Sequence, residues 1–151
     1  MALSLATPRG LDARHAPYAV FLLRLALGTM FLAHSIVLKL LTYGLAGTAA
    51  FFVNVGLPRE LAYLTFGAEA LGGALLILGV QARWVALALS PILIGALVWV
   101  HAANGWVFTA PNGGWEYPAY LFVLCIAQAL LGDGAFALMP SHRLQTEGDR
   151  P

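Results

Sequence analysis

The chain has 151 residues, of which 60% are hydrophobic and only 10% are charged, and its formal net charge is +1. Soluble domains carry about 25% charged residues, so this composition excludes an ordinary water-soluble domain. The small net charge does not favour a nucleic-acid partner. The one cysteine, Cys125, excludes an intrachain disulfide and a thiolate metal site. A single membrane domain is expected.

The chain contains four apolar runs, each about as long as the 20 residues that cross a hydrocarbon core of roughly 30 Å. The helices expected from these runs cover residues 18–41, 61–79, 84–103 and 117–138. This pattern predicts an all-α fold, an integral membrane four-helix bundle over residues 18–138 with tails at 1–17 and 139–151. The connection at 42–60 favours a short interfacial helix, and an ordinary loop packed on the bundle is an equal alternative.

The distribution of Lys and Arg predicts the orientation of these helices. With four spans, the two tails and the second loop share one side of the membrane, whereas only Arg59 lies in a connection on the other side. The arginines on the shared side are Arg9, Arg14, Arg83, Arg143 and Arg150. Basic residues collect on the cytoplasmic side, so both termini are expected in the cytoplasm and the chain is expected to be a multi-pass protein.

A carboxylate, Glu69, lies near the middle of the second apolar run. Ionisable groups at this depth are rare and usually face the bundle interior with a partner. The predicted topology brings several polar residues to the outer half of the bundle although they are scattered in sequence. These residues are His34, Lys39, Glu69, His101 and Glu116. Arg24 falls in the inner half of the first helix. This convergence marks the outer half as the candidate site.

A structural explanation of these polar residues stays open beside a functional one. Arg24 could pair with Glu69 and fix helix register, while His101 and Glu116 could be rim residues in water. His34 and His101 could bind a metal ion together with Glu69, but no compact motif such as H-E-x-x-H supports this, so no metal site is predicted.

The helix faces and the aromatic residues give further expectations. Gly72 and Gly73, on the Glu69 face, permit close approach of a neighbouring backbone. Pro91 predicts a kink in the third helix and a freed carbonyl one turn earlier, re-satisfied by a neighbour. On the fourth helix, the face that is expected to point inward contains Glu116, Tyr120, Ala127 and Gly134. Trp106 and Trp115 either anchor the protein at the interface or line the entrance of a pocket for a planar lipid-soluble ligand.

These residues resemble the DoxX family of bacterial membrane proteins, from about residue 18 to residue 138. The motifs that carry the resemblance are Arg24 to Gly28, His34-Ser35 with Lys39-Leu40, Gly56-Leu57-Pro58, Glu69 with Gly72-Gly73 and Gly79, Arg83, His101 with Asn104-Gly105, Gly114 to Tyr117, and Gly132-Asp133-Gly134. Ser35 stands where the family pattern usually has glycine. The resemblance implies a compact four-helix protein of the bacterial inner (plasma) membrane. It also implies an association with membrane redox complexes, since the family is related to the small subunit of thiosulfate:quinone oxidoreductase.

The functional expectation is a component of a membrane redox system with a quinone pocket in the outer half of the bundle. Because quinone reduction consumes protons, Glu69 is the expected proton donor, and His34 or His101 is expected to hydrogen-bond a quinone carbonyl. Lys39 or Arg24 is expected to stabilise the reduced oxygen. The other expected ligand-binding residues are Glu116, Trp106 and Trp115.

The alternative is a non-enzymatic membrane scaffold, or a subunit that binds a small lipophilic ligand and recruits a redox partner. Catalysis is expected only as a subunit of a quinone-linked oxidoreductase. The partners that the sequence suggests are the lipid bilayer, a redox-enzyme subunit and further copies of the chain, with no nucleic acid. A transporter is a third possibility, which would require oligomerisation because four spans are few for a monomer.

Overall fold

A computed structural model describes residues 12–142, and this part of the chain is helical with no strand. The predicted tails lie largely outside the described residues. The elements in chain order are α1 (Ala16–Leu32), the π-helix η1 (Ala33–Thr42), α2 (Gly44–Asn54), α3 (Arg59–Leu78), α4 (Ala82–Gly95), the π-helix η2 (Ala96–His101), the short 3₁₀-helix η3 (Ala102–Asn104) and α5 (Glu116–Leu131). The predicted all-helical fold is confirmed, with five α-helices because the short helix between the first two long ones is present as α2.

Three continuous helical segments are long and apolar enough to cross a membrane. They cover Ala16–Thr42, Arg59–Leu78 and Ala82–Asn104, with 27, 20 and 23 residues. These segments confirm a membrane protein. The helix α5 has 16 residues, or roughly 24 Å at 1.5 Å per residue, so the fourth span stays a prediction.

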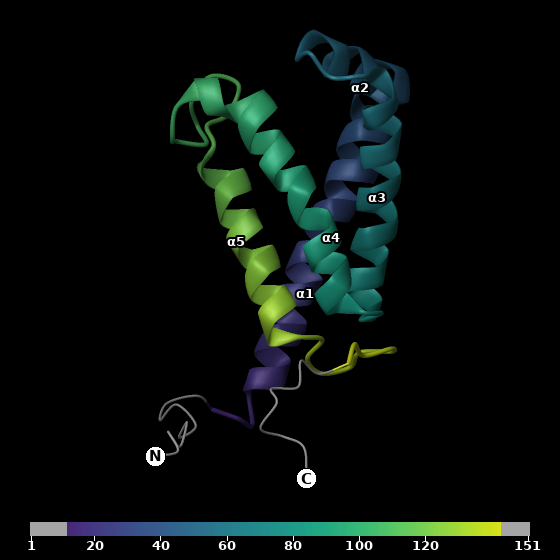
Figure 1. The fold of residues 1–151 in the computed structure, drawn as a ribbon, viewed down its shortest axis with the longest axis vertical. Coiled ribbons are helices and arrows are strands. Elements are labelled where there is room, and N and C mark those ends of the chain that lie inside the picture. The colour runs from purple at the N-terminus through teal and green to yellow at the C-terminus, as the bar shows by residue number, and fades with distance from the viewer. Residues whose placement is uncertain (1–11, 143–151) are drawn as a thin grey trace, which may run out of the picture.

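The long helices converge at one end of the molecule and separate toward the other (Figure 1). The start of α1 and residues 132–141 lie at the convergent end (Figure 1), which we call the terminus end. The opposite end, with α2 and the long connection between η3 and α5, is called the loop end. The chain runs up through α1, down through α3, up through α4 and down through α5 (Figure 1).

The tightest helix contact joins α1 to α3 through two glycines. A Cβ atom built on Gly28 would lie 2.7 Å from the carbonyl oxygen of Gly73, and one built on Gly73 would lie 2.8 Å from that of Gly28. Only glycine permits two helix backbones to approach so closely. The predicted role of Gly73 is therefore confirmed, and Gly28 is its counterpart on α1.

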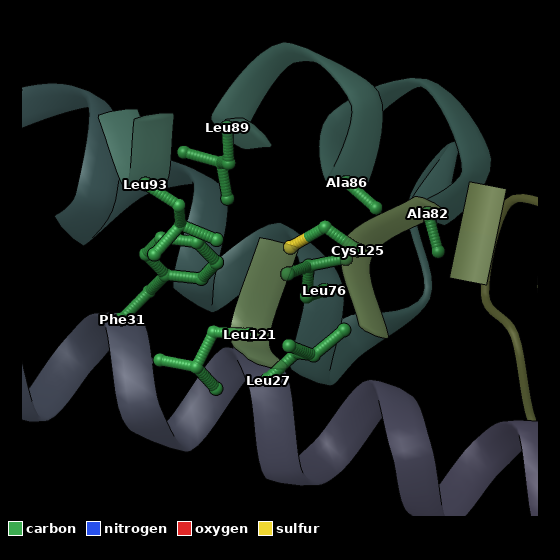
Figure 2. Close-up of a cluster of buried hydrophobic side chains, with 9 residues drawn as sticks. All are labelled: Leu27, Phe31, Leu76, Ala82, Ala86, Leu89, Leu93, Leu121 and Cys125. Atoms are coloured by element: carbon green, nitrogen blue, oxygen red, sulfur yellow. The ribbon is translucent and has the colours of Figure 1, made fainter. Parts of the chain in front are cut away.

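The hydrophobic core is built from side chains of α1, α3, α4 and α5 that point toward one another (Figure 2). The buried cluster consists of Leu27, Phe31, Leu76, Ala82, Ala86, Leu89, Leu93, Leu121 and Cys125. Toward the loop end, by contrast, η1 buries only Ser35 and η2 buries no residue. Apolar packing therefore stabilises the terminus half of the bundle, whereas polar contacts join the helices in the loop half.

Pro91 lies inside α4, as expected from the sequence. Proline removes one hydrogen bond to the carbonyl four residues earlier, which here is that of Leu87. The hydroxyl of Ser90 donates to this carbonyl oxygen at 2.8 Å. The freed group is thus satisfied by the preceding residue of the same helix rather than by a neighbouring helix.

The interior face predicted for α5 is wrong. The buried residues of α5 are Pro118, Leu121, Cys125 and Gln128, whereas Tyr120 is 63% exposed. The prediction favoured small and polar side chains, but α5 packs mainly on α4, which presents alanines that leave room for larger apolar groups. The buried face of α5 is therefore the one whose side chains fill the space beside these alanines.

The C-terminal boundary of the fourth predicted helix is also corrected. The helix α5 ends at Leu131 rather than at residue 138, because Gly132 and Gly134 adopt positive φ angles of 91° and 71° that L side chains rarely adopt. Residues 132–141, here called the strap, then cross the terminus end of the bundle. Backbone hydrogen bonds tie the strap to α1 and to the α3–α4 turn: Ala135 N to Pro17 O, Leu138 N to Leu78 O, Met139 N to Gly79 O and Gln81 N to Met139 O.

Candidate functional site

A buried ion pair lies in the loop half of the bundle. The ammonium of Lys39, on η1, donates to Oε2 of Glu69, on α3, at 2.5 Å. The two side chains are only 13% and 5% exposed. Each charge therefore neutralises the other in a region of low dielectric, where either alone would be costly. The sequence predicted both residues for the site, and the structure brings them into contact.

Lys39 lies on the π-helix η1. A π-helix has wider turns than an α-helix, and such segments occur often at functional sites. The Thr42 hydroxyl donates to the carbonyl oxygen of Val37 at 2.8 Å, five residues back, and the Thr48 hydroxyl of α2 donates to the carbonyl oxygen of Lys39 at 3.0 Å. The uniform α-helix expected over 18–41 misses this change of register, and nothing in the apolar pattern signals it.

His34 lies between the ion pair and α5. Its Nδ1 is 3.0 Å from the carbonyl oxygen of Met30, and because a carbonyl only accepts, this nitrogen carries the proton and leaves Nε2 as an acceptor in the neutral ring. The imidazole stacks on the ring of Tyr117, with centroids 6.5 Å apart and an angle of 23° between the planes. A protonated His34 ring would be near enough to Glu69 for the two charges to attract.

An aromatic pocket of about 500 Å³ opens beside Tyr117 at the start of α5. Its lining residues are Trp106, Phe108, Trp115, Glu116, Tyr117, Ala119, Tyr120 and Val123. The rings of Trp106 and Trp115 meet edge to face at 4.4 Å. Three predicted residues, Trp106, Trp115 and Glu116, therefore lie in one pocket. The sequence interpretation missed Tyr117, although it belongs to the Gly114 to Tyr117 motif.

Glu116 holds the long connection beside this pocket through two hydrogen bonds. Its Oε1 accepts a hydrogen bond from the backbone N–H of Phe108 at 3.0 Å, and its own N–H donates to the carbonyl oxygen of Trp106 at 3.0 Å. These bonds fix the aromatic side chains of the connection relative to α5. Glu116 therefore positions the wall of the pocket, in addition to lining it.

His101 lies in a different hydrogen-bond cluster from Glu69. Its Nδ1 donates to the carbonyl oxygen of Gly113 at 2.9 Å, and the Asn104 amide donates to the same oxygen at 2.9 Å. Both side chains hold the far end of the long connection. The structure thus joins His101 to the frame of the aromatic pocket but not to the ion pair.

Arg24 is separated from the other predicted site residues. It is fully buried at the terminus end, donates from Nη2 to the carbonyl oxygen of Ala135 at 3.0 Å and lies over the ring of Phe21. Glu69 pairs with Lys39, so the Arg24–Glu69 pair considered from the sequence is not formed. Arg24 therefore contacts the strap.

The strap and the end of α5 are held by further polar residues, to which the sequence interpretation assigned no role in a site. Asp133 accepts from the backbone N–H of Ala82 at 2.7 Å and from the N–H of Ser141 at 2.9 Å, while Arg83 donates to the carbonyl oxygens of Ala129 and Leu130 at the end of α5. The Gly132-Asp133-Gly134 motif signals this arrangement, because the two glycines allow the turn and the aspartate closes it.

The metal alternative finds no support in the described part of the chain. Within residues 12–142, no three His, Cys, Asp or Glu side chains gather closely enough to hold a metal ion. The polar groups that the structure brings together in the loop half are Lys39, Glu69 and His34, next to an aromatic pocket.

Comparisons with known proteins agree with the sequence resemblance. The DoxX family model matches residues 19–102. A protein of Bacillus subtilis (strain 168) named "Putative oxidoreductase CatD" is 32% identical over 119 residues, which cover 79% of this chain and 83% of the relative. No solved structure matches the chain.

Proposed function

Because the chain belongs to the DoxX family, we propose that it is a component of a membrane redox system that holds a quinone-type head group in the aromatic pocket. A redox-associated role in the membrane is supported by the family and by the name of the Bacillus subtilis relative. The observation that carries the finer proposal is the arrangement of the Lys39–Glu69 pair, His34 and Tyr117, which connects buried proton-binding groups to the pocket.

The pocket fits a planar lipid-soluble ligand in size and in chemistry. Small-molecule sites have volumes of about 300–1,000 Å³, and their walls are mainly apolar and aromatic with a few polar groups. The pocket has about 500 Å³ and is walled by Trp106, Trp115 and Tyr117 with a single carboxylate, that of Glu116. Aromatic rings stack well on the face of a flat ring system. A quinone head group satisfies these requirements.

A bound quinone would supply two-electron chemistry, with the electrons coming from the redox centre of a partner protein. The residues of this chain would manage the protons. The Lys39–Glu69 pair can hold a proton on either partner, and His34 can accept one at Nε2 while Nδ1 stays bonded to Met30. Tyr117 lies against His34 and also lines the pocket, so the proposal gives His34 the position of a proton carrier between the ion pair and the ligand.

The orientation follows from the same proposal. In the sequence, arginines are concentrated in the two tails and in the second connection, which supports a cytoplasmic location for the terminus end in the bacterial inner membrane, and the pocket would then lie toward the outer face. Protons exchanged at the ion pair would come from that face.

Tryptophan fluorescence tests binding directly. The chain has four tryptophans, and replacing Trp84 and Trp99 by Phe leaves Trp106 and Trp115 as pocket reporters. A short-chain benzoquinone added to this protein in detergent should quench the remaining fluorescence with saturation. A further change, Tyr117→Leu, should weaken the saturable binding, whereas Glu60→Gln, an exposed carboxylate at the start of the same helix as Glu69, should not. Linear, unsaturable quenching in every protein would refute the pocket.

Infrared difference spectroscopy tests the role of the ion pair. Chemical reduction of bound quinone should produce a carboxyl signal from Glu69, and the double change Lys39→Met with Glu69→Leu should remove this signal while ligand binding is retained. Glu60→Gln is again the matched control. An unchanged spectrum in the double variant would remove the pair from the proposed chemistry.

A second candidate function is supported by the exposed aromatic connection. Trp106, Val107 and Phe108 are consecutive and each is more than half exposed, which suits a subunit that docks a redox partner without binding a ligand itself. Val107 does not line the pocket, so Val107→Asp separates the two functions. Loss of a co-purified partner with unchanged benzoquinone binding would identify docking as the role of this connection. Unchanged co-purification would exclude docking through Val107.

A further inference from the structure

A second cavity lies in the angle between α2 and the start of α3, away from the aromatic pocket. Its volume is about 300 Å³. One wall is the face of α2 that carries three alanines and Val53, and the other consists of Arg59 and Tyr63 on the first turns of α3, with Asn54 at the turn between the helices. The cavity is thus apolar along one side and polar along the other.

The polar side presents three hydrogen-bond donors that have no partner within the described residues. Within residues 12–142 the ion pairs are His15–Asp12 and Lys39–Glu69, and no hydrogen bond involves the side chains of Asn54, Arg59 or Tyr63. A guanidinium, an amide and a phenol hydroxyl that face one cavity suit an anion rich in acceptor oxygens. A phosphate group has this chemistry.

The depth of the cavity indicates which phosphate would meet it. The helix α3 has 20 residues, so it is about 30 Å long and matches the hydrocarbon thickness of a bilayer. Arg59 is its first residue and Tyr63 lies one turn deeper. The donors therefore fall at the level of lipid headgroups, and the alanine face of α2 falls beside the first carbons of the acyl chains.

We propose that this cavity binds one phospholipid, with the phosphodiester on Arg59, Asn54 and Tyr63 and an acyl chain along the alanine face of α2. The lipid would fill the angle between α2 and α3. Because Thr48 of α2 donates to the carbonyl oxygen of Lys39 at 3.0 Å, the seated lipid also supports the helix that contacts the Lys39 segment. This site is separate from the proposed quinone pocket and does not depend on it.

Native mass spectrometry of the delipidated protein tests the proposal after dioleoyl phosphatidylglycerol is added back. The wild-type protein should show a discrete complex with one lipid. The variant Arg59→Gln should lose this complex, and Ala50→Trp, which fills the apolar wall, should lose it as well. Arg59→Lys should restore part of it. The matched control is Arg14→Gln, which removes the same charge from an exposed site at the other end of the molecule. Circular dichroism checks that each variant is folded.

Three outcomes would overturn the proposal. A one-lipid complex that persists equally in Arg59→Gln and Ala50→Trp would show that the lipid binds elsewhere. The absence of a discrete complex in the wild-type protein would show that the cavity does not hold a lipid. If millimolar inorganic phosphate displaces the lipid and Ala50→Trp has no effect, the cavity binds a free anion and not a phospholipid.

Discussion

The Lys39–Glu69 pair should contribute to the stability of the protein whether or not a ligand is bound. Removing one partner of a buried ion pair costs about 3–5 kcal/mol, because the remaining charge is left unpaired in low dielectric. Both side chains are nearly enclosed and their charged atoms are 2.5 Å apart, so Lys39→Met and Glu69→Leu should each approach this loss. For a chain of this size, about 1 kcal/mol lowers the melting temperature by roughly 2–4 °C. Each single variant should therefore melt about 6–20 °C below the wild type.

The double variant Lys39→Met with Glu69→Leu decides whether this reasoning is correct. Two apolar side chains of similar volume remove both charges together, and replacing a buried pair in this way is often neutral or stabilising. The double variant should therefore melt near the wild type. Thermal unfolding in detergent, followed by tryptophan fluorescence, measures all four proteins. If the losses of the two single variants simply add in the double variant, the side chains do not interact and the reasoning is refuted.

Three further predictions concern other parts of the bundle. Gly73→Ala should lower the melting temperature, because the added Cβ would lie 2.8 Å from a carbonyl oxygen of α1. In the control variant Gly67→Ala the added Cβ has no atom within 4 Å, so the melting temperature should stay unchanged or rise. Equal effects of the two changes would contradict the close approach of α1 and α3. Cys125 is fully buried, so a maleimide should label it only after unfolding, and rapid labelling of the folded protein would contradict this core. A hydrogen bond with His15 holds the pKa of Asp12 below its ordinary value of 3.8. This contact therefore supports the first turn of α1 above that value and is lost as the pH falls through the lower, folded-state pKa. The protection factor of the amides at the start of α1, which compares their exchange with that of an unfolded chain at the same pH, should then fall, and it should not change over this pH range in Asp12→Asn.

The helices could be predicted from the sequence because the apolar runs have the length of a membrane span. The approach of α1 to α3 at Gly73 and the short helix between the first two spans follow from residue size and from the mixed composition of residues 42–60. The convergence of Lys39, Glu69 and His34 also follows from topology, since the predicted depth of each residue depends only on its position along its helix.

The partners within the site could not be predicted. Glu69 pairs with Lys39 because Arg24 lies at the other end of the bundle, against the strap, and the π-helical conformation of η1, which carries Lys39, leaves no mark in the apolar pattern. The buried face of α5 depends on the alanines of α4, a property of the neighbour and not of α5 itself. Arg24 was interpreted through its charge alone, whereas its partner, the carbonyl of Ala135, belongs to the strap, where the sequence predicted continued helix.

The strap affects the order in which this protein can reach its final form during synthesis. Its backbone bonds join residues 135–139 to Pro17 at the start of α1 and to Leu78, Gly79 and Gln81 at the α3–α4 turn. Each of these earlier segments is synthesised before the strap. The contact between the guanidinium of Arg24 and the carbonyl of Ala135 therefore cannot form until every later helix has been made. The strap can therefore complete the bundle only after the last helix has been made, and Arg24, on the first helix, obtains its backbone partner from the last described segment of the chain.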